Sequence, residues 1–134
     1  MPVSYLRAVS SPGDFIGQGK SYSYAGEELT IRRFPRGVMI NVGGWTVQFG
    51  GPNNEFLHTG EYRDAKRLPF SGDSPGIEFY GNGRGANRIA GKFVVWELEV
   101  KGNDVTRLAV DFIQHCEETQ PPLYGMIRFN SSFH

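Results

Sequence analysis

Several features that mark other protein classes are missing from this chain of 134 residues. It contains a single cysteine, Cys116, so no disulfide bond can form within the chain and the fold must be held by packing. The 14 lysines and arginines balance the 14 aspartates and glutamates, whereas proteins that bind nucleic acid or anionic membranes need a basic surface. No apolar run approaches the roughly 20 residues of a transmembrane helix. We therefore expect no nucleic-acid partner and no membrane partner.

The N-terminal segment lacks the pattern of a secretory signal peptide. Residues 1–15, MPVSYLRAVSSPGDF, contain no basic stretch followed by an apolar one. A chain from which a leader had been removed would read in the same way. The prediction is therefore a cytoplasmic protein if the chain is complete, and the compartment is otherwise left open.

A helical period is also missing, and turn-forming residues are plentiful. The 18 glycines and 8 prolines separate short segments in which apolar and polar residues alternate, as they do in strands. About ten such strands without helices are typical of an all-β domain. We predict one domain over residues 1–134, an antiparallel β-sandwich of the jelly-roll or Greek-key type, with a closed β-barrel as the alternative.

Two long strands and a turn form the part of the chain around which the rest is expected to fold. Residues 93–100, FVVWELEV, and residues 105–116, VTRLAVDFIQHC, both alternate with a period of two. Residues 101–104, KGND, supply the positive φ angles that a tight hairpin turn needs. A third strand at residues 123–129, after a pair of prolines, would complete a meander.

The same alternation divides the side chains of residues 105–116 between two faces. Leu108 and Phe112 share the apolar face with Gln114 and Cys116. The opposite face carries the intervening residues, Arg107, Ala109, Asp111, Ile113 and His115. We expect the first face to pack on the core.

The remaining strands are expected in shorter segments, at residues 5–10, 20–24, 29–34, 38–42, 45–49 and 77–80. Residues 56–69 are the least periodic part and are predicted to form a loop with a short strand at Tyr62. Residues 81–85, GNGRG, form a glycine corner. Trp45 and Trp96 each alternate with valine or leucine, which predicts both tryptophans in the core.

Four segments of the chain resemble one recurrent family. They are SSPGDFIGQGKSYSY at residues 10–24, GNGRGANRIAGKFVVWELEV at 81–100, VDFIQHCEE at 110–118 and LYGMIRFNSS at 123–132. Together they resemble an uncharacterised bacterial family of small all-β domains, found in hypothetical or exported proteins. The resemblance covers nearly the whole chain, implies an all-β fold and brings no activity with it. In that family a cysteine often stands at the position of Ala86, which implies that a disulfide partner of Cys116 is missing here.

The segment from Gln114 to Glu117 concentrates reactive side chains without forming a recognisable site. A Cys116 nucleophile with His115 as its base would need the two side chains to meet, and adjacent strand residues point to opposite faces. Zinc sites use closely spaced pairs of Cys or His, and no such pair occurs here. The glycine corner resembles a phosphate loop, but such a loop leads into a helix. No catalytic residue, metal or cofactor is predicted.

Aromatic side chains next to polar ones give the functional hypothesis. Sugar-binding modules hold the apolar face of a ring on a flat aromatic side chain and bind its hydroxyls with polar neighbours. Tyrosines outside the expected core and the polar residues near them are the predicted ligand-binding set, which is Tyr62, Tyr80, Arg84, Asn87 and His115.

The sequence thus predicts a soluble, non-enzymatic binding module for a carbohydrate or another polar ligand. The alternative is a protein-interaction or structural module that acts as a homodimer, paired through an edge strand or an exposed apolar face. Arg32, Arg33 and Arg36 bear on this alternative, because basic residues either meet an acidic partner or keep an edge strand from pairing. A hydrolase that depends on Cys116 is the third hypothesis.

Overall fold

The computed structural model describes all residues, 1–134, and is all-β, with about 60% of them in strands. Its ten strands are β1 (Val3–Ser10), β2 (Ser21–Ala25), β3 (Thr30–Phe34), β4 (Gly37–Val42), β5 (Trp45–Gly50), β6 (Gly60–Arg67), β7 (Gly76–Gly81), β8 (Ile89–Lys101), β9 (Asp104–Cys116) and β10 (Leu123–Ser131). The chain also contains three 3₁₀ turns of three residues each, η1 (Gly26–Glu28), η2 (Pro52–Asn54) and η3 (Leu68–Phe70). No helix is long and apolar enough to span a membrane. The predicted all-β class with about ten strands is confirmed.

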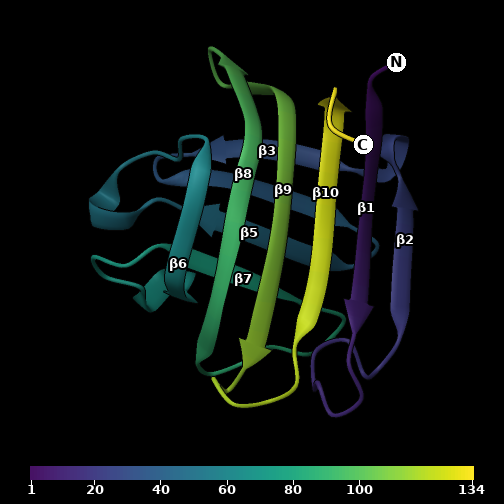
Figure 1. Cartoon of the computed structure of the whole chain (residues 1–134), viewed down its shortest axis with the longest axis vertical. Coiled ribbons are helices and arrows are strands. Elements are labelled where there is room, and N and C mark those ends of the chain that lie inside the picture. Colours follow the sequence, from purple (N-terminus) through teal and green to yellow (C-terminus); the bar gives the residue numbers. More distant parts are fainter.

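The strands form one continuous sheet in the order β2-β1-β10-β9-β8-β6-β7-β5-β4-β3, curled into a half-barrel. All neighbours are antiparallel except β6 and β7, which are parallel, so the sheet is mixed. Figure 1 shows β8, β9, β10 and β1 running together in front, with β3, β5 and β7 crossing behind them at a steep angle. The two separate sheets of the expected sandwich are not confirmed, because β6 pairs with both β8 and β7 and joins the two layers.

The core fills the space between the two layers and is rich in aromatic rings. Phe49 of β5 meets Phe93 of β8 at 5.0 Å and Phe112 of β9 at 5.3 Å between ring centroids. Trp45 packs against Phe79 at 5.0 Å, and its indole N–H donates to the Tyr24 hydroxyl of β2 at 3.1 Å. Aromatic contacts at these separations add to the burial of apolar area, and here they connect the front strands with the back ones.

The predicted hairpin is confirmed, because β8 and β9 pair antiparallel along their whole length. The predicted inward face of β9 is confirmed as well, since Gln114 and Cys116 are buried together with Leu108 and Phe112. Two details differ. The segment expected to be mostly loop contains the eight-residue strand β6, and Trp96 is 47% exposed rather than in the core.

The prediction for Trp96 is wrong because the inward face of β8 changes along the strand. The buried side of the strand carries Phe93 and Val95. A bulge between Val95 and Glu97 interrupts the pairing with β9 and leaves Trp96 on the outer surface, where it stacks on Phe133 at 6.3 Å. After the bulge Leu98 is the residue that packs on the core, and a strict period of two cannot anticipate such a one-residue shift.

Gln114 fastens the front layer to the back layer with two hydrogen bonds. The Phe79 N–H donates to its Oε1 at 2.8 Å, and its Nε2 donates to the Phe79 carbonyl at 3.0 Å. Strand β6 pairs with β7 only at Gly76 and Ile77, so the peptide of Phe79 has no strand beside it on that side. The buried amide of Gln114 takes the place of that strand.

Gln114→Leu should therefore destabilise the protein strongly. The substitution keeps an apolar side chain of similar size but leaves the N–H and C=O of Phe79 buried without partners, at about 1–3 kcal/mol each. We expect the free energy of unfolding in urea to fall by roughly 2–5 kcal/mol.

Gln48→Leu is the matched control, because Gln48 is a half-buried strand glutamine that bonds only the Met39 sulfur, at 3.4 Å. Its free energy of unfolding should change by less than about 1 kcal/mol. Equal losses in the two variants would show that the amide of Gln114 does not join the layers.

Candidate functional site

Two adjoining hollows lie on the outer face of the front layer, over β6, β8, β9 and β10. The polar hollow, of about 550 Å³, is lined by Glu61, Arg63, Asp64, Ala90, Gly91, Lys92, Ile113 and His115. The aromatic hollow, of about 400 Å³, is lined by Glu61, Lys92, Phe93, Val94, Asp111, Phe112, Ile113 and Tyr124. Because they share Glu61, Lys92 and Ile113, they form one trough that crosses the strands.

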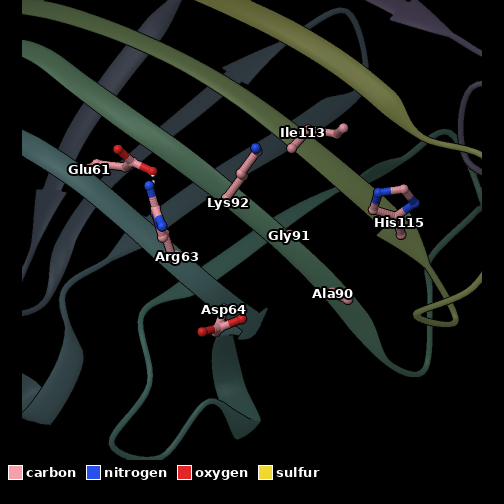
Figure 2. A pocket seen from close by; sticks show the side chains of 8 residues that line it. All are labelled: Glu61, Arg63, Asp64, Ala90, Gly91, Lys92, Ile113 and His115. Carbon is pink, nitrogen blue, oxygen red and sulfur yellow. Dashed lines mark hydrogen bonds and ion pairs between the residues drawn. The ribbon is translucent and has the colours of Figure 1, made fainter.

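The polar hollow exists because β6 bulges away from β8. Pairing of the two strands is regular up to Tyr62 and resumes at Ala65 after a shift in register, with Asp64 at a φ of 54°. A residue with positive φ re-aims the strand. Across from the bulge, Ala90 and Gly91 have little or no side chain, so nothing fills the gap. Figure 2 shows β6 residues on one side of the hollow and β9 residues on the other.

The charges of the polar hollow are only partly paired. The Arg63 guanidinium bonds Glu61 and lowers the pKa of that exposed carboxyl below its usual value. Asp64 and Lys92 take part in none of the ion pairs of the chain. The hollow therefore offers one free cation and one free carboxylate to a ligand.

His115 of β9 borders the polar hollow and is oriented by the loop that follows its strand. Its Nδ1 lies 2.8 Å from the Gln120 carbonyl. A carbonyl only accepts, so Nδ1 carries the hydrogen and Nε2 is left without a partner in the chain. His115 thus presents a polar ring atom that can accept a hydrogen bond from a ligand.

The aromatic hollow combines an exposed ring with an immobilised carboxylate. Tyr124 of β10 is 49% exposed and lies across from Ile113 of β9. Asp111 accepts from the Trp96 indole N–H at 3.0 Å through Oδ2, and its Oδ1 lies 2.8 Å from the Arg128 guanidinium. Two exposed aromatic side chains, Trp96 and Tyr124, therefore flank one carboxylate.

Arg128 is the buried support of this carboxylate. Its side chain is almost entirely covered, and its NH1 also donates to the carbonyls of Val110 and Ile127 at 3.3 Å and 3.0 Å. The C-terminal residues lie over this part of the face, because Phe133 stacks on Trp96 of β8 and the Tyr5 hydroxyl of β1 donates to the last carbonyl at 2.8 Å. The contact with Arg128 is an ion pair without a hydrogen bond, because Asp111 Oδ1 makes none, and the hydrogen bond from the Trp96 indole orients the carboxylate.

The five residues predicted to bind ligand do not gather in one place. His115 borders the polar hollow. Tyr62 stacks on Phe93 at 4.8 Å, while Arg84 donates to the Ile16 carbonyl at 2.7 Å and covers the Trp45 ring.

The other two predicted residues lie apart from the trough as well. Tyr80 is on β7 of the back layer, opposite Thr46 of β5. Asn87 lies beside a separate, smaller hollow of about 200 Å³, and its backbone N–H donates to Glu117 at 2.7 Å.

Sequence reasoning missed Tyr124, Asp111 and Lys92 as candidate ligand-binding residues, although part of the signal was present. The alternation of β9 had already placed Asp111 and Ile113 on one face with His115. Nothing in the order of residues, however, indicates that β10 brings Tyr124 against that face, because strand neighbours are set by the topology of the sheet.

Cys116 is unsuited to nucleophilic catalysis. Its side chain is only 1% exposed, and burial raises the pKa of the thiol from 9.0 to about 11, helped by the negative charges of Glu117 and Asp14. His115, the adjacent residue, is bonded to the Gln120 carbonyl instead. Reactive thiols are exposed and have lowered pKa values. The Cys116 thiol is instead buried and has a raised pKa.

Cys116 should accordingly react slowly with a disulfide reagent such as dithionitrobenzoate. At pH 8 a rise of the pKa from 9.0 to about 11 lowers the thiolate fraction about 100-fold relative to the unfolded chain. The folded protein should react at least that much more slowly than the protein in urea. The folded state also holds the proton more tightly, so stability should decrease as the pH rises from 9 toward 11. Equal rates in the two states would restore the Cys116 hydrolase as a hypothesis.

No group of three or more His, Cys, Asp or Glu side chains is placed to hold a metal ion. Comparison with protein-family models, with curated proteins and with solved structures finds no match to this chain. The family resemblance of its four segments therefore stays a prediction.

Proposed function

We propose that the chain is a non-enzymatic binding module that holds a carbohydrate, or another ligand with an apolar face and polar edges, in the outer trough. The observation that carries the proposal is the exposed ring of Tyr124 beside the immobilised carboxylate of Asp111. Lys92 lies in the same hollow and makes no ion pair in the chain.

The chemistry of a sugar ring fits these three side chains. One face of a pyranose presents C–H groups that pack against an aromatic ring, and its hydroxyls donate to carboxylates and accept from ammonium groups. Oδ1 of Asp111 is buried beside Arg128, so the acceptor sites left for a ligand are those of Oδ2, which accepts only from the Trp96 indole. Ile113 and Val94 supply apolar surface between the polar groups.

The rigidity of the trough also supports the binding proposal. The ligand-facing side chains stand on long, paired strands of the front layer, and Asp111 is held from two sides. A site that does not have to be ordered on binding loses less conformational entropy. The trough is shallow and open to solvent, which suits a sugar chain that passes over the surface better than a small molecule that must be enclosed.

Binding should be tested by ¹⁵N NMR titration with a panel of neutral, amino and acidic monosaccharides at up to about 50 mM, which detects dissociation constants in the millimolar range. We expect shifts concentrated at Asp111, Ile113 and Tyr124 for at least one sugar. Tyr124→Ala should weaken binding of that sugar about tenfold, since stacking contributes roughly 1 kcal/mol or more.

Phe15→Ala is the matched control, because Phe15 is 46% exposed and lines neither hollow of the trough. It should bind the sugar as the unmodified chain does. A panel without localised shifts, or an equal loss of affinity in both variants, would overturn the carbohydrate proposal.

A further inference from the structure

The two edges of the sheet are protected very differently. Strand β3 at one edge carries the exposed Arg32 and Arg33, and Arg33 also donates to the Gly102 carbonyl at 2.9 Å. Strand β2 at the other edge, Ser21–Ala25 with the sequence SYSYA, has no charged residue and no proline. Charges and prolines are what usually keep an edge from pairing with another chain, so β2 is the open edge.

The backbone of β2 offers its free hydrogen-bonding groups at this edge. The Ser10 N–H of β1 donates to the Lys20 carbonyl at 3.0 Å, so residue 20 and every second residue after it turn their peptide groups toward β1. Ser21, Ser23 and Ala25 therefore direct their N–H and C=O groups away from the sheet. In agreement, the Ala25 N–H donates to the Glu28 carboxylate at 2.8 Å instead of to β1.

The side chains of β2 leave this edge accessible. Ser21, Ser23 and Ala25 are exposed, while Tyr22 and Tyr24 are turned into the core, where Tyr22 packs edge-on against Trp45. The sheet has no further strand beyond β2. A second strand can approach without displacing any element of the fold.

We propose that β2 pairs with β2 of a second copy of this chain, antiparallel and centred on Ser23, to give one sheet that runs through both copies. Centring on Ser23 opposes Ser21 to the partner's Ala25, so all three outward residues of each strand meet an outward residue. The two Ser23 residues exchange two hydrogen bonds, and each Ser21 N–H donates to the partner's Ala25 carbonyl. The Ser21 carbonyl of the partner takes the place of the Glu28 carboxylate at the Ala25 N–H, so the Ala25–Glu28 bond is exchanged for a bond between the two strands.

Charge complementarity selects a second copy as the occupant of this edge. Lys20 precedes β2 and Glu27 follows it; both are exposed, and neither belongs to an ion pair of the chain. In the antiparallel pairing, Lys20 lies across from the turn that holds the partner's Glu27, and the symmetry creates this contact twice. A parallel pairing would instead oppose lysine to lysine and glutamate to glutamate, which is unfavourable.

The dimer has a consequence for the outer trough, which holds only if the proposed function is correct. A two-fold axis between antiparallel strands stands perpendicular to the sheet, so both copies turn their outer faces to the same side. Two troughs on one side can bind one polymeric ligand at two points. Such linked binding strengthens a weak single-site affinity without any new contact.

Sedimentation velocity on the whole chain, over a range of concentrations, tests the pairing. Two five-residue strands bury less than the roughly 1,200 Å² of the smallest standard interfaces, so we expect a reversible dimer with a dissociation constant of roughly 10 µM to 1 mM.

Ser23→Pro should abolish the dimer, because proline removes the outward N–H at the centre of the pairing. The variant should still fold, since that N–H makes no bond to β1, and an unchanged circular-dichroism melting curve would show this. Ser23→Thr keeps the N–H and should dimerise normally.

A charge exchange identifies the partner as a second copy. K20E and E27K should each weaken the dimer about tenfold, because each places like charges at both contacts. An equal mixture of the two variants should form a heterodimer at least as tight as the unmodified dimer, and the double variant K20E/E27K should regain affinity. An unmodified chain that stays monomeric at all concentrations would overturn the proposal. So would a dimer that survives Ser23→Pro, or a mixture that associates no better than its components.

Two of the variants distinguish a failure of the dimer proposal from a failure of the binding proposal. Tyr124→Ala leaves β2 untouched and should dimerise as the unmodified chain does. Ser23→Pro leaves the trough untouched and should bind a monosaccharide normally. Failure of sugar binding therefore does not affect the pairing, and failure of the pairing removes only the two-point binding.

Discussion

The fold depends on the contact between the amide of Gln114 and the peptide of Phe79. Where pairing between two neighbouring strands ends inside a curled sheet, peptide groups are left without partners. In this chain β6 pairs with β7 over just two residues and then diverges, so β7 would face the core with an open edge. One glutamine from β9 completes that edge, and the aromatic core formed by Phe49, Phe93 and Phe112 can close around it. In the half-barrel, the side chain of Gln114 thus joins the front layer to the back layer at Phe79.

A second irregularity of β6, the bulge before Ala65, produces the candidate site. To leave β8 and reach β7, β6 bulges between Tyr62 and Ala65, and the bulge opens the polar hollow beside Lys92. Bulges commonly occur next to functional sites because they re-aim side chains without disturbing the rest of the sheet. The hollow thus comes from the bulge, whereas the peptide of Phe79 is left without a strand beside it because β6 ends at Arg67, where η3 begins.

The sequence predicted the strands well and the outer face poorly, for a physical reason. Alternation is a local property, so it placed Gln114 and Cys116 inside and Asp111 and His115 outside. It failed at Trp96, because the bulge after Val95 reverses the alternation of β8 and leaves Trp96 outside while Leu98 packs on the core. The trough combines residues from four strands, and the neighbours of a strand depend on long-range topology that no short segment records. The predicted binding residues were consequently distributed over the molecule, and only His115 lies at the trough.

The placement of charge at the sheet edges agrees with the proposal that the front layer binds the ligand. The arginine-bearing edge at β3 ends the back layer, whereas the uncharged edge at β2 ends the front layer. Extension of the sheet at β2 would continue the surface that holds Tyr124, while extension at β3 would add nothing to it. Solvent-exposed edges carry a risk of aggregation unless their pairing is limited. In the proposed dimer the charges of Lys20 and Glu27 would limit the pairing at β2, because they favour one antiparallel arrangement that ends with two copies.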